Sequence, residues 1–129
     1  MADSIKVGNV EIMAVLDMIP PPRDPSVMFP ETTEADWSSH QDALENGKLQ
    51  LYYGVWVVRS QGQTILVDTG MGPGPHEHLG GVEGQMFDRL RDVLIPADRM
   101  NNTNVGPSDE VNIVVHTHLH GDHVGWNLR

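Results

Sequence analysis

The stretch 113-IVVHTHLHGDH-123 decides the fold. Its first residues overlap an apolar, β-branched segment, 111-VNIVVHT-117, whose composition predicts a short strand that is buried on both faces. Four histidines and one aspartate then fall within the eight residues from His116 to His123. Gly121 lets the chain turn sharply without a Cβ clash, so we expect a helix to begin there.

The cluster has the form H-x-H-x-D-H, and its spacing predicts a metal centre. His118 and His120 are two residues apart, so an extended or turning backbone places both imidazoles on one side. Asp122 and His123 are neighbours at the mouth of the expected helix and point in different directions. The arrangement therefore suits two metal ions side by side, one held by each pair. Imidazole and carboxylate are good ligands for zinc, and also for iron or manganese.

Composition narrows the ways in which a metal could be held and the partners to expect. The chain has 129 residues, enough for one domain, and it contains no cysteine, so any metal must be held by His, Asp or Glu. Its formal net charge of -10 disfavours nucleic acid and anionic membrane surfaces as partners. Neither a signal-peptide core nor a membrane-spanning apolar run is visible, so a cytoplasmic location is the default expectation.

Alternation of apolar residues predicts strands before the cluster. Two short strands are expected within 5–17, with a turn near Gly8. Two more are expected at 48–60 and 63–70, around a tight turn at Gln61-Gly62. No repeat and no domain boundary is apparent, so we treat 1–129 as a single domain.

Helices and loops are expected between these strands. Segment 18–31 carries five of the nine prolines and predicts a loop, which could be a lid over the site or a plain surface loop. Thr32 or Thr33 can cap a helix that runs to about Asn46. A second, amphipathic helix is expected over 83–95, where apolar residues recur at helical spacing.

A second motif, 64-TILVDTG-70, precedes the histidine cluster by about 50 residues. A strand that ends in D-T-G, followed by H-x-H-x-D-H after a hydrophobic strand, resembles the metallo-β-lactamase-fold hydrolases. The resemblance covers the chain from about Val10 to its end. The continuation 124-VGWN-127 is similar to the lactonase-like and organophosphate-hydrolase-like branches of that superfamily.

The resemblance implies an α/β fold, a half of an αββα sandwich, and a metal-dependent hydrolase of esters, lactones or related small substrates. His118 and His120 would be ligands of the first zinc, and Asp122 and His123 of the second, with Asp122 also assigned a catalytic role. Asp68 would orient the metal loop by hydrogen bonding without touching metal. In such enzymes a metal-bound hydroxide attacks a carbonyl or phosphoryl centre.

The chain also departs from this family. A full member is roughly twice as long, and its later half supplies another histidine, a bridging aspartate and a final histidine. We therefore expect this chain to be the N-terminal half, inactive alone because each ion would have only two protein ligands. An uncovered sheet face would favour self-association or pairing with the missing half.

Other interpretations stay open at this point. An iron-dependent oxidoreductase on the same scaffold, a non-catalytic metal-binding fragment, and a polar loop with coincidental histidines are the rivals. His116 is expected to be a packed or hydrogen-bonded strand residue, recruited as a third ligand only if it lies close enough to the metal. His76 and His78 are expected in an exposed loop, and the tryptophans are expected to pack.

Overall fold

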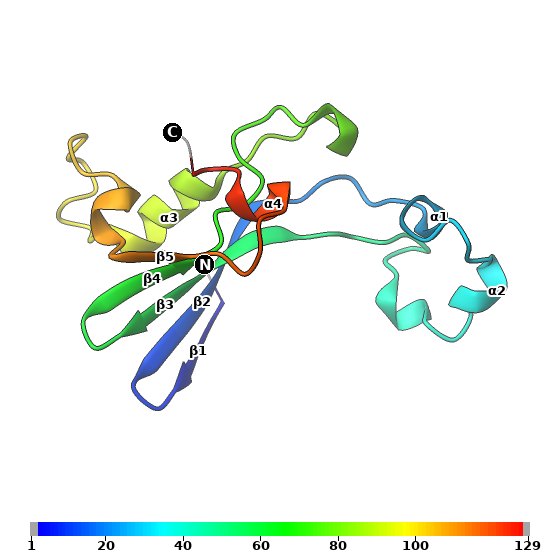
Figure 1. Cartoon of the computed structure of the whole chain (residues 1–129), viewed down its shortest axis with the longest axis horizontal. Coiled ribbons are helices and arrows are strands. Elements are labelled where there is room, and N and C mark those ends of the chain that lie inside the picture. Colours follow the sequence, from blue (N-terminus) through cyan, green and yellow to red (C-terminus); the bar gives the residue numbers. More distant parts are fainter. Residues whose placement is uncertain (1–2, 128–129) are drawn as a thin grey trace.

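The computed structural model describes residues 3–127, and within them five strands form one sheet. The strands follow the order β1-β2-β3-β4-β5, and the first four make an antiparallel meander (Figure 1). The last strand is parallel to β4, because the chain crosses over through a helix before it returns to the sheet. The strands are β1 Ser4–Val7, β2 Val10–Met18, β3 Tyr53–Ser60, β4 Gln63–Val67 and β5 Ile113–Val115.

The helices of the described residues are mostly single turns. Only α3 is longer, and it is the crossover element between β4 and β5. The α-helices are α1 Pro25–Met28, α2 Glu34–Trp37, α3 Met86–Leu94 and α4 Gly121–Val124, and the 3-10 turns are η1 Gln41–Ala43, η2 Glu77–Leu79 and η3 Pro107–Glu110. No helix within residues 3–127 is long and apolar enough to cross a membrane.

The hydrophobic core lies between α3 and one face of the sheet. Met86, Leu90 and Leu94 recur every four residues, so they form one stripe along α3, and all three are buried. This stripe packs against alternate residues of the strands, which point to the same face. The strand side of the core consists of Met13, Val15, Val55, Val57 and Leu66.

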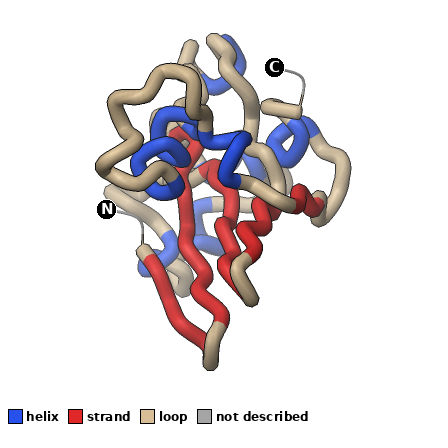
Figure 2. Tube along the Cα trace, turned by 90° about the vertical axis from the view of Figure 1, so that its left-hand side faces the viewer, coloured by secondary structure: helices blue, strands red, loops and turns tan. Residues whose placement is uncertain are grey.

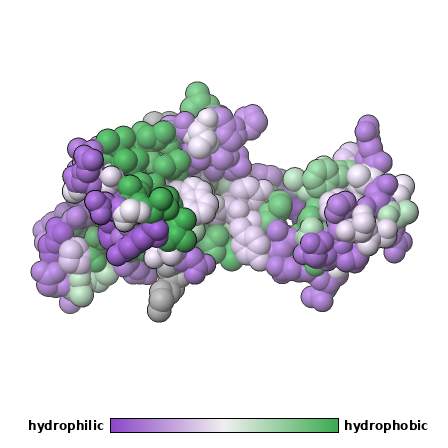
Figure 3. All heavy atoms as spheres, turned by 90° about the horizontal axis from the view of Figure 1, so that it is seen from below, coloured by the Kyte–Doolittle hydropathy of each residue, from purple (hydrophilic) through white to green (hydrophobic). Residues whose placement is uncertain are grey.

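The opposite face of the sheet is apolar and uncovered within the described residues. Trp56 is 52% exposed and pairs with Val67, which in turn pairs with Val115. The largest hydrophobic patches in Figure 3 lie on the larger lobe, which contains the sheet. Trp56 is therefore not the packing residue that the sequence suggested. One helix layer on one sheet is half of the four layers of an αββα sandwich, in agreement with the expected α/β fold.

The expectation that β5 is buried on both faces was wrong. Its three residues, Ile113 to Val115, are 41–49% exposed. The reason is that β5 is an edge strand, paired on one side only with β4, in the described part of the chain. Self-association or pairing with a complementary half stays a prediction.

The segment between β2 and β3, residues 19–52, projects from the sheet as an arm that carries α1, α2 and η1 (Figure 1). The expected loop at 18–31 contains α1, and the expected helix up to Asn46 was wrong, because only α2 forms. Thr33 does cap α2 through a capping box, but none of its four residues is buried, so packing does not extend the helix. The segment after it bends back through η1, and β3 begins at Tyr53.

The first four strands form where the sequence predicted strands, but β3 begins at Tyr53 instead of residue 48, and β4 ends at Val67 instead of residue 70. The turn at Gly8 joins β1 to β2, and Gln61-Gly62 joins β3 to β4. Gln61 and Gly62 both have positive φ, as a two-residue hairpin of the I′ type requires. Figure 2 shows the strands side by side, with the hairpin that starts near the N-terminus extending beyond the others.

Candidate metal centre

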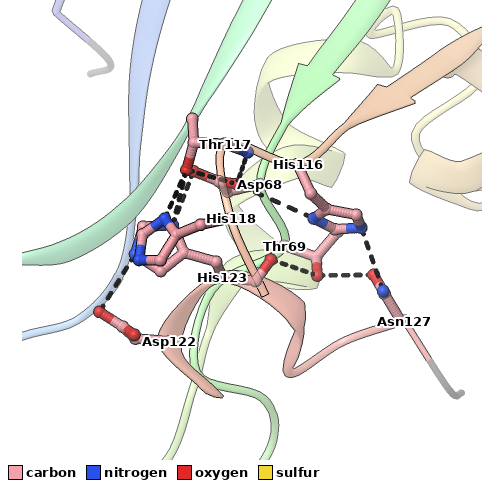
Figure 4. Close-up of polar contacts among 8 residues, drawn as sticks. All are labelled: Asp68, Thr69, His116, Thr117, His118, Asp122, His123 and Asn127. Atoms are coloured by element: carbon pink, nitrogen blue, oxygen red, sulfur yellow. Dashed lines mark hydrogen bonds and ion pairs between the residues drawn. The ribbon is translucent and has the colours of Figure 1, made fainter. Parts of the chain in front are cut away.

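The histidine cluster occupies the connection between the end of β5 and the first turn of α4. The imidazole rings of His118 and His123 have centroids 3.8 Å apart, and those of His118 and His120 are 4.7 Å apart. Asp122 lies beside them, with its Oδ2 atom 3.3 Å from the Nε2 atom of His123 (Figure 4). The structure thus brings together all four residues that the sequence singled out as metal ligands.

Asp68 is the residue that organises this connection. It follows β4 with a φ of 64°, in the left-handed region that few residues other than glycine adopt. Its backbone N–H donates to the carbonyl of Val115 at 2.8 Å, which aligns the ends of β4 and β5. Its carboxylate accepts from the backbone N–H of Thr117 at 2.8 Å and contacts the Nδ1 atom of His123 at 2.8 Å. A strained backbone held by so many contacts is typical of a functional position.

This contact determines which nitrogen of His123 is left free to act as a ligand. A carboxylate only accepts hydrogen bonds, so Nδ1 of His123 carries the proton and donates it to Asp68. The Nε2 atom is then the one with a free lone pair, and it lies on the side of Asp122. A histidine whose second nitrogen bonds a carboxylate is the usual form of a metal-binding histidine.

Thr117 contacts Asp68 and two histidines of the cluster, His118 and His123. Its hydroxyl donates to the carboxylate of Asp68, with Oγ1 2.9 Å from Oδ2. The same Oγ1 lies 3.0 Å from Nδ1 of His118 and 3.2 Å from Nδ1 of His123. Because Nδ1 of His118 is engaged here, its Nε2 atom is also left for a ligand role.

The ionisation of Asp68 follows from these contacts. Burial raises the pKa of its carboxyl group, since the side chain is only 8% exposed. The hydrogen bonds from His123 and Thr117 act in the opposite direction and prevail, so the pKa lies below its usual range. Asp68 is therefore a carboxylate at neutral pH, the form that accepts from His123.

The donor atoms are of the types that bind a zinc-type ion, but the described residues provide too few of them for each ion. Imidazole and carboxylate are ligands of zinc, iron and manganese, and two of the imidazoles present a free Nε2 atom. However, no three His, Asp or Glu side chains are arranged to hold one ion anywhere in residues 3–127. The residues described here therefore offer at most two donors to each ion.

His116 turns away from the cluster. Its Nε2 atom lies 3.0 Å from Nδ2 of Asn127, and its buried Nδ1 atom has no hydrogen-bond partner among the described residues. The Nδ1 atom is 3.8 Å from Oδ1 of Asp68, too far for a hydrogen bond. His116 is hydrogen-bonded, as expected, but it follows β5 and does not lie within the strand as the sequence suggested. Its recruitment as a ligand is not favoured.

His76 and His78 lie in the glycine-rich loop after β4. Their rings form an edge-to-face pair at 6.0 Å, and Nε2 of His76 contacts the carbonyl of Gly72 at 3.1 Å. His78 is exposed and His76 is partly buried. These contacts agree with the loop role expected from the sequence.

The sequence model of the metallo-beta-lactamase superfamily matches residues 54–129, which include both motifs. The chain belongs to the metallo-beta-lactamase superfamily. The match begins within β3 and therefore contains the D-T-G strand, the crossover helix and the histidine cluster. A comparison with the curated proteins gave no match.

Solved structures confirm the metallo-beta-lactamase fold. A probable metal-dependent hydrolase from Staphylococcus aureus is 21% identical, with a TM-score of 0.64, and the match covers 93% of this chain and 41% of that one. The hydrolase AbOPH of the beta lactamase superfamily is 20% identical, with a TM-score of 0.68 and coverage of 95% and 38%. AidC, a dizinc quorum-quenching lactonase in complex with a product, is 17% identical, with a TM-score of 0.67 and coverage of 96% and 38%. The chain spans about two fifths of the length of each of these structures.

Sequence reasoning missed the residues that attach the metal loop, residues 116–127, to the D-T-G loop. Thr69 donates from its backbone N–H to the carbonyl of His123 at 2.8 Å, and from its hydroxyl to Oδ1 of Asn127 at 2.8 Å. Gly125 donates from its N–H to the carbonyl of Gly70 at 2.8 Å. The middle letter of D-T-G and the Asn of V-G-W-N were visible signals, because short polar side chains next to a motif often bond its backbone.

Proposed function

We propose that this chain carries the H-x-H-x-D-H half-site of a metal-dependent hydrolase that acts on an ester, a lactone or a related small substrate. The observation that carries the proposal is the contact between Asp68 and Nδ1 of His123, which leaves Nε2 directed at the side of Asp122. The printed names of the similar structures, two hydrolases and a dizinc lactonase, support the same class.

The residues of this chain would have two kinds of role, metal binding and the positioning of the metal ligands. His118 and His120 would hold one ion, and Asp122 and His123 the other. Bound zinc-type ions supply Lewis acidity toward water and toward a carbonyl or phosphoryl oxygen. Asp68 would keep His123 in the tautomer that can bind metal, and Thr117 would hold Asp68 and the ring of His118 in register.

We also infer that this chain by itself is a poor catalyst. A catalytic zinc site typically has three protein ligands and an open position, and each ion here would have two. Zinc binding should therefore be measurable where turnover is not. Metal analysis of protein purified without added metal would distinguish zinc from the iron expected of an oxidoreductase.

Calorimetric titration with zinc tests the proposal. Wild type should bind zinc, and the double variant His118→Ala/His120→Ala should lose most of that binding. The matched control is His40→Ala/His78→Ala, which removes two exposed histidines far from the cluster in sequence. Equal binding by wild type and the first double variant, or equal loss in both double variants, would refute the assignment.

A further inference from the structure

A buried carboxylate outside the two motifs is the feature with no assigned role. Asp17 is fully buried and lies in β2 at a bulge, between Leu16 and Met18 in the pairing with β3. An ionisable side chain in an apolar strand is unusual, because burying a charge is unfavourable unless hydrogen bonds replace water. The contacts of Asp17 show what replaces water here.

Three N–H groups from distant segments converge on this carboxylate. Oδ2 accepts from the backbone N–H of Met71 at 2.7 Å, and Oδ1 from that of Met86 at 3.0 Å. Oδ1 also accepts from the indole Nε1–H of Trp126 at 3.1 Å. These donors lie 54, 69 and 109 residues further along the chain. One side chain therefore connects the D-T-G loop, the start of α3 and the segment after α4.

The neighbouring backbone is shaped around Asp17. A Cβ atom at Gly70 would lie 2.5 Å from Oδ2, and one at Gly84 would lie 2.7 Å from Oδ1. A Cβ atom at Gly125 would overlap the backbone of Met71. Glycine at these positions lets the three segments approach the carboxylate and one another more closely than any side chain would allow.

Two of the segments that Asp17 holds are the ones that hold His123. The loop anchored through Met71 also contains Thr69, whose N–H bonds the carbonyl of His123. Trp126, anchored through its indole, donates its own N–H to the carbonyl of Thr69 at 3.2 Å. Movement of either segment would therefore move the backbone of His123.

We propose that Asp17 is a positioning residue for the metal site: its carboxylate fixes the 69–71 loop and Trp126 so that His123 stays aligned with Asp68. This inference rests on the proposed function only in naming the site as a metal centre. Its direct content is the alignment of the His123 ring, which can be measured without metal. A residue that merely stabilises the core would lower stability and leave the ring unchanged.

Two variants test the proposal. Asp17→Asn keeps one acceptor oxygen but places an NH2 group against a backbone N–H donor, so at least one of the three contacts is lost. Trp126→Phe removes the indole donor and keeps an aromatic ring against Phe87, whose centroid is 5.0 Å from that of Trp126. It is the milder change and serves if Asp17→Asn does not fold.

The control is Leu94→Ala. Leu94 is 5% exposed in the core, and it lies at the end of α3 opposite to Met86. It should lower stability without loosening the metal loop. All variants are measured at a temperature where each is folded.

Two readouts are compared: zinc affinity, and the 15N shifts of the His123 ring in metal-free protein at pH 8. Both Asp17→Asn and Trp126→Phe should weaken zinc binding about 3–10-fold, less than the 10–100-fold typical of a direct partner of a ligand. Their His123 ring should change from the Nδ1–H form toward a mixture of tautomers. Leu94→Ala should change neither readout.

The outcomes separate this proposal from the proposed function. If wild type binds no zinc, the metal site fails, and the His123 ring shifts alone decide the role of Asp17. The proposal would be overturned if the 15N shifts of the His123 ring matched those of wild type in Asp17→Asn and Trp126→Phe, or in whichever of the two folds. An equal change in Leu94→Ala would also overturn it, because the effect would then follow stability alone.

Discussion

The metal loop, residues 116–127, and the arm, residues 19–52, are both short of regular structure, but they are held in different ways. Side-chain contacts of the metal loop reach residues 49 to 109 positions away, at Asp68, Thr69 and Asp17. Most side-chain contacts of the arm stay within seven residues, such as those of Thr33 with Asp36 and of Tyr52 with Glu45. An irregular segment is thus preorganised when the core of the domain holds it, and not because of its own turns.

The long-range contacts of the arm are confined to its base. Arg23 donates to the carbonyl of His78 at 3.1 Å. Arg23 also forms an antiparallel bridge with Leu49, which joins the outgoing and returning segments of the arm. Further out, the ring of Phe29 lies 5.6 Å from that of Trp37, both within the arm. Figure 1 shows α1 and α2 far from α4, so the use of the arm as a lid stays a prediction.

Hydrogen exchange should show the largest difference between the two regions. The amides of Asp68, Gly125 and Trp126, which bond across loops, should exchange at least about 100-fold more slowly than those of Asp36 and Ser38. The reason is that local opening breaks the arm bonds, whereas the loop bonds break only with the core. Equal protection in the two regions would show that the arm is as firmly held as the metal loop.

A matched pair of substitutions should show the next largest difference. Asp68 and Asp36 each accept from a backbone N–H and from a threonine hydroxyl, but only Asp68 also contacts a histidine. Asp68→Asn would place an NH2 group against Nδ1 of His123, which favours the other tautomer and removes the Nε2 lone pair. We expect zinc affinity to fall about 10–100-fold, and Asp36→Asn to leave it unchanged.

Zinc titration of both variants checks this prediction, with circular dichroism to confirm that they fold. If Asp68→Asn bound zinc as tightly as wild type, Asp68 would be reduced to a residue of the turn after β4. If Asp36→Asn weakened binding as well, the separation between the arm and the metal loop would be wrong.

The parts of the fold that depend on local pattern were predictable from the sequence. The hairpins at Gly8 and at Gln61-Gly62 carry their own turn signals, and the stripe of α3 shows in its spacing. The length of α2 was not predictable in this way. A good cap at Thr33 starts a helix, but nothing packs on it to extend it.

The residues of the site also fall into those that the sequence could predict and those that it could not. The ligand candidates and Asp68 were predictable from the sequence, because each lies within a short, recognisable motif. Asp17 could not be assigned, since its three donors come together only when β2, the D-T-G loop and Trp126 meet in space. The exposure of β5 also depends on what lies beside it, which the strand's own composition does not specify.

The most direct test of the account is a zinc titration followed by NMR at each histidine ring. All seven histidines report at once, so the ligands and their controls are measured in one sample. The ring signals of His118, His120 and His123 should shift on zinc binding, with Nε2 as the bound atom of His118 and His123. The signals of His40, His76, His78 and His116 should stay where they are. Shifts at His76 and His78 instead, or uniform small shifts at every histidine, would contradict a metal centre at the end of β5.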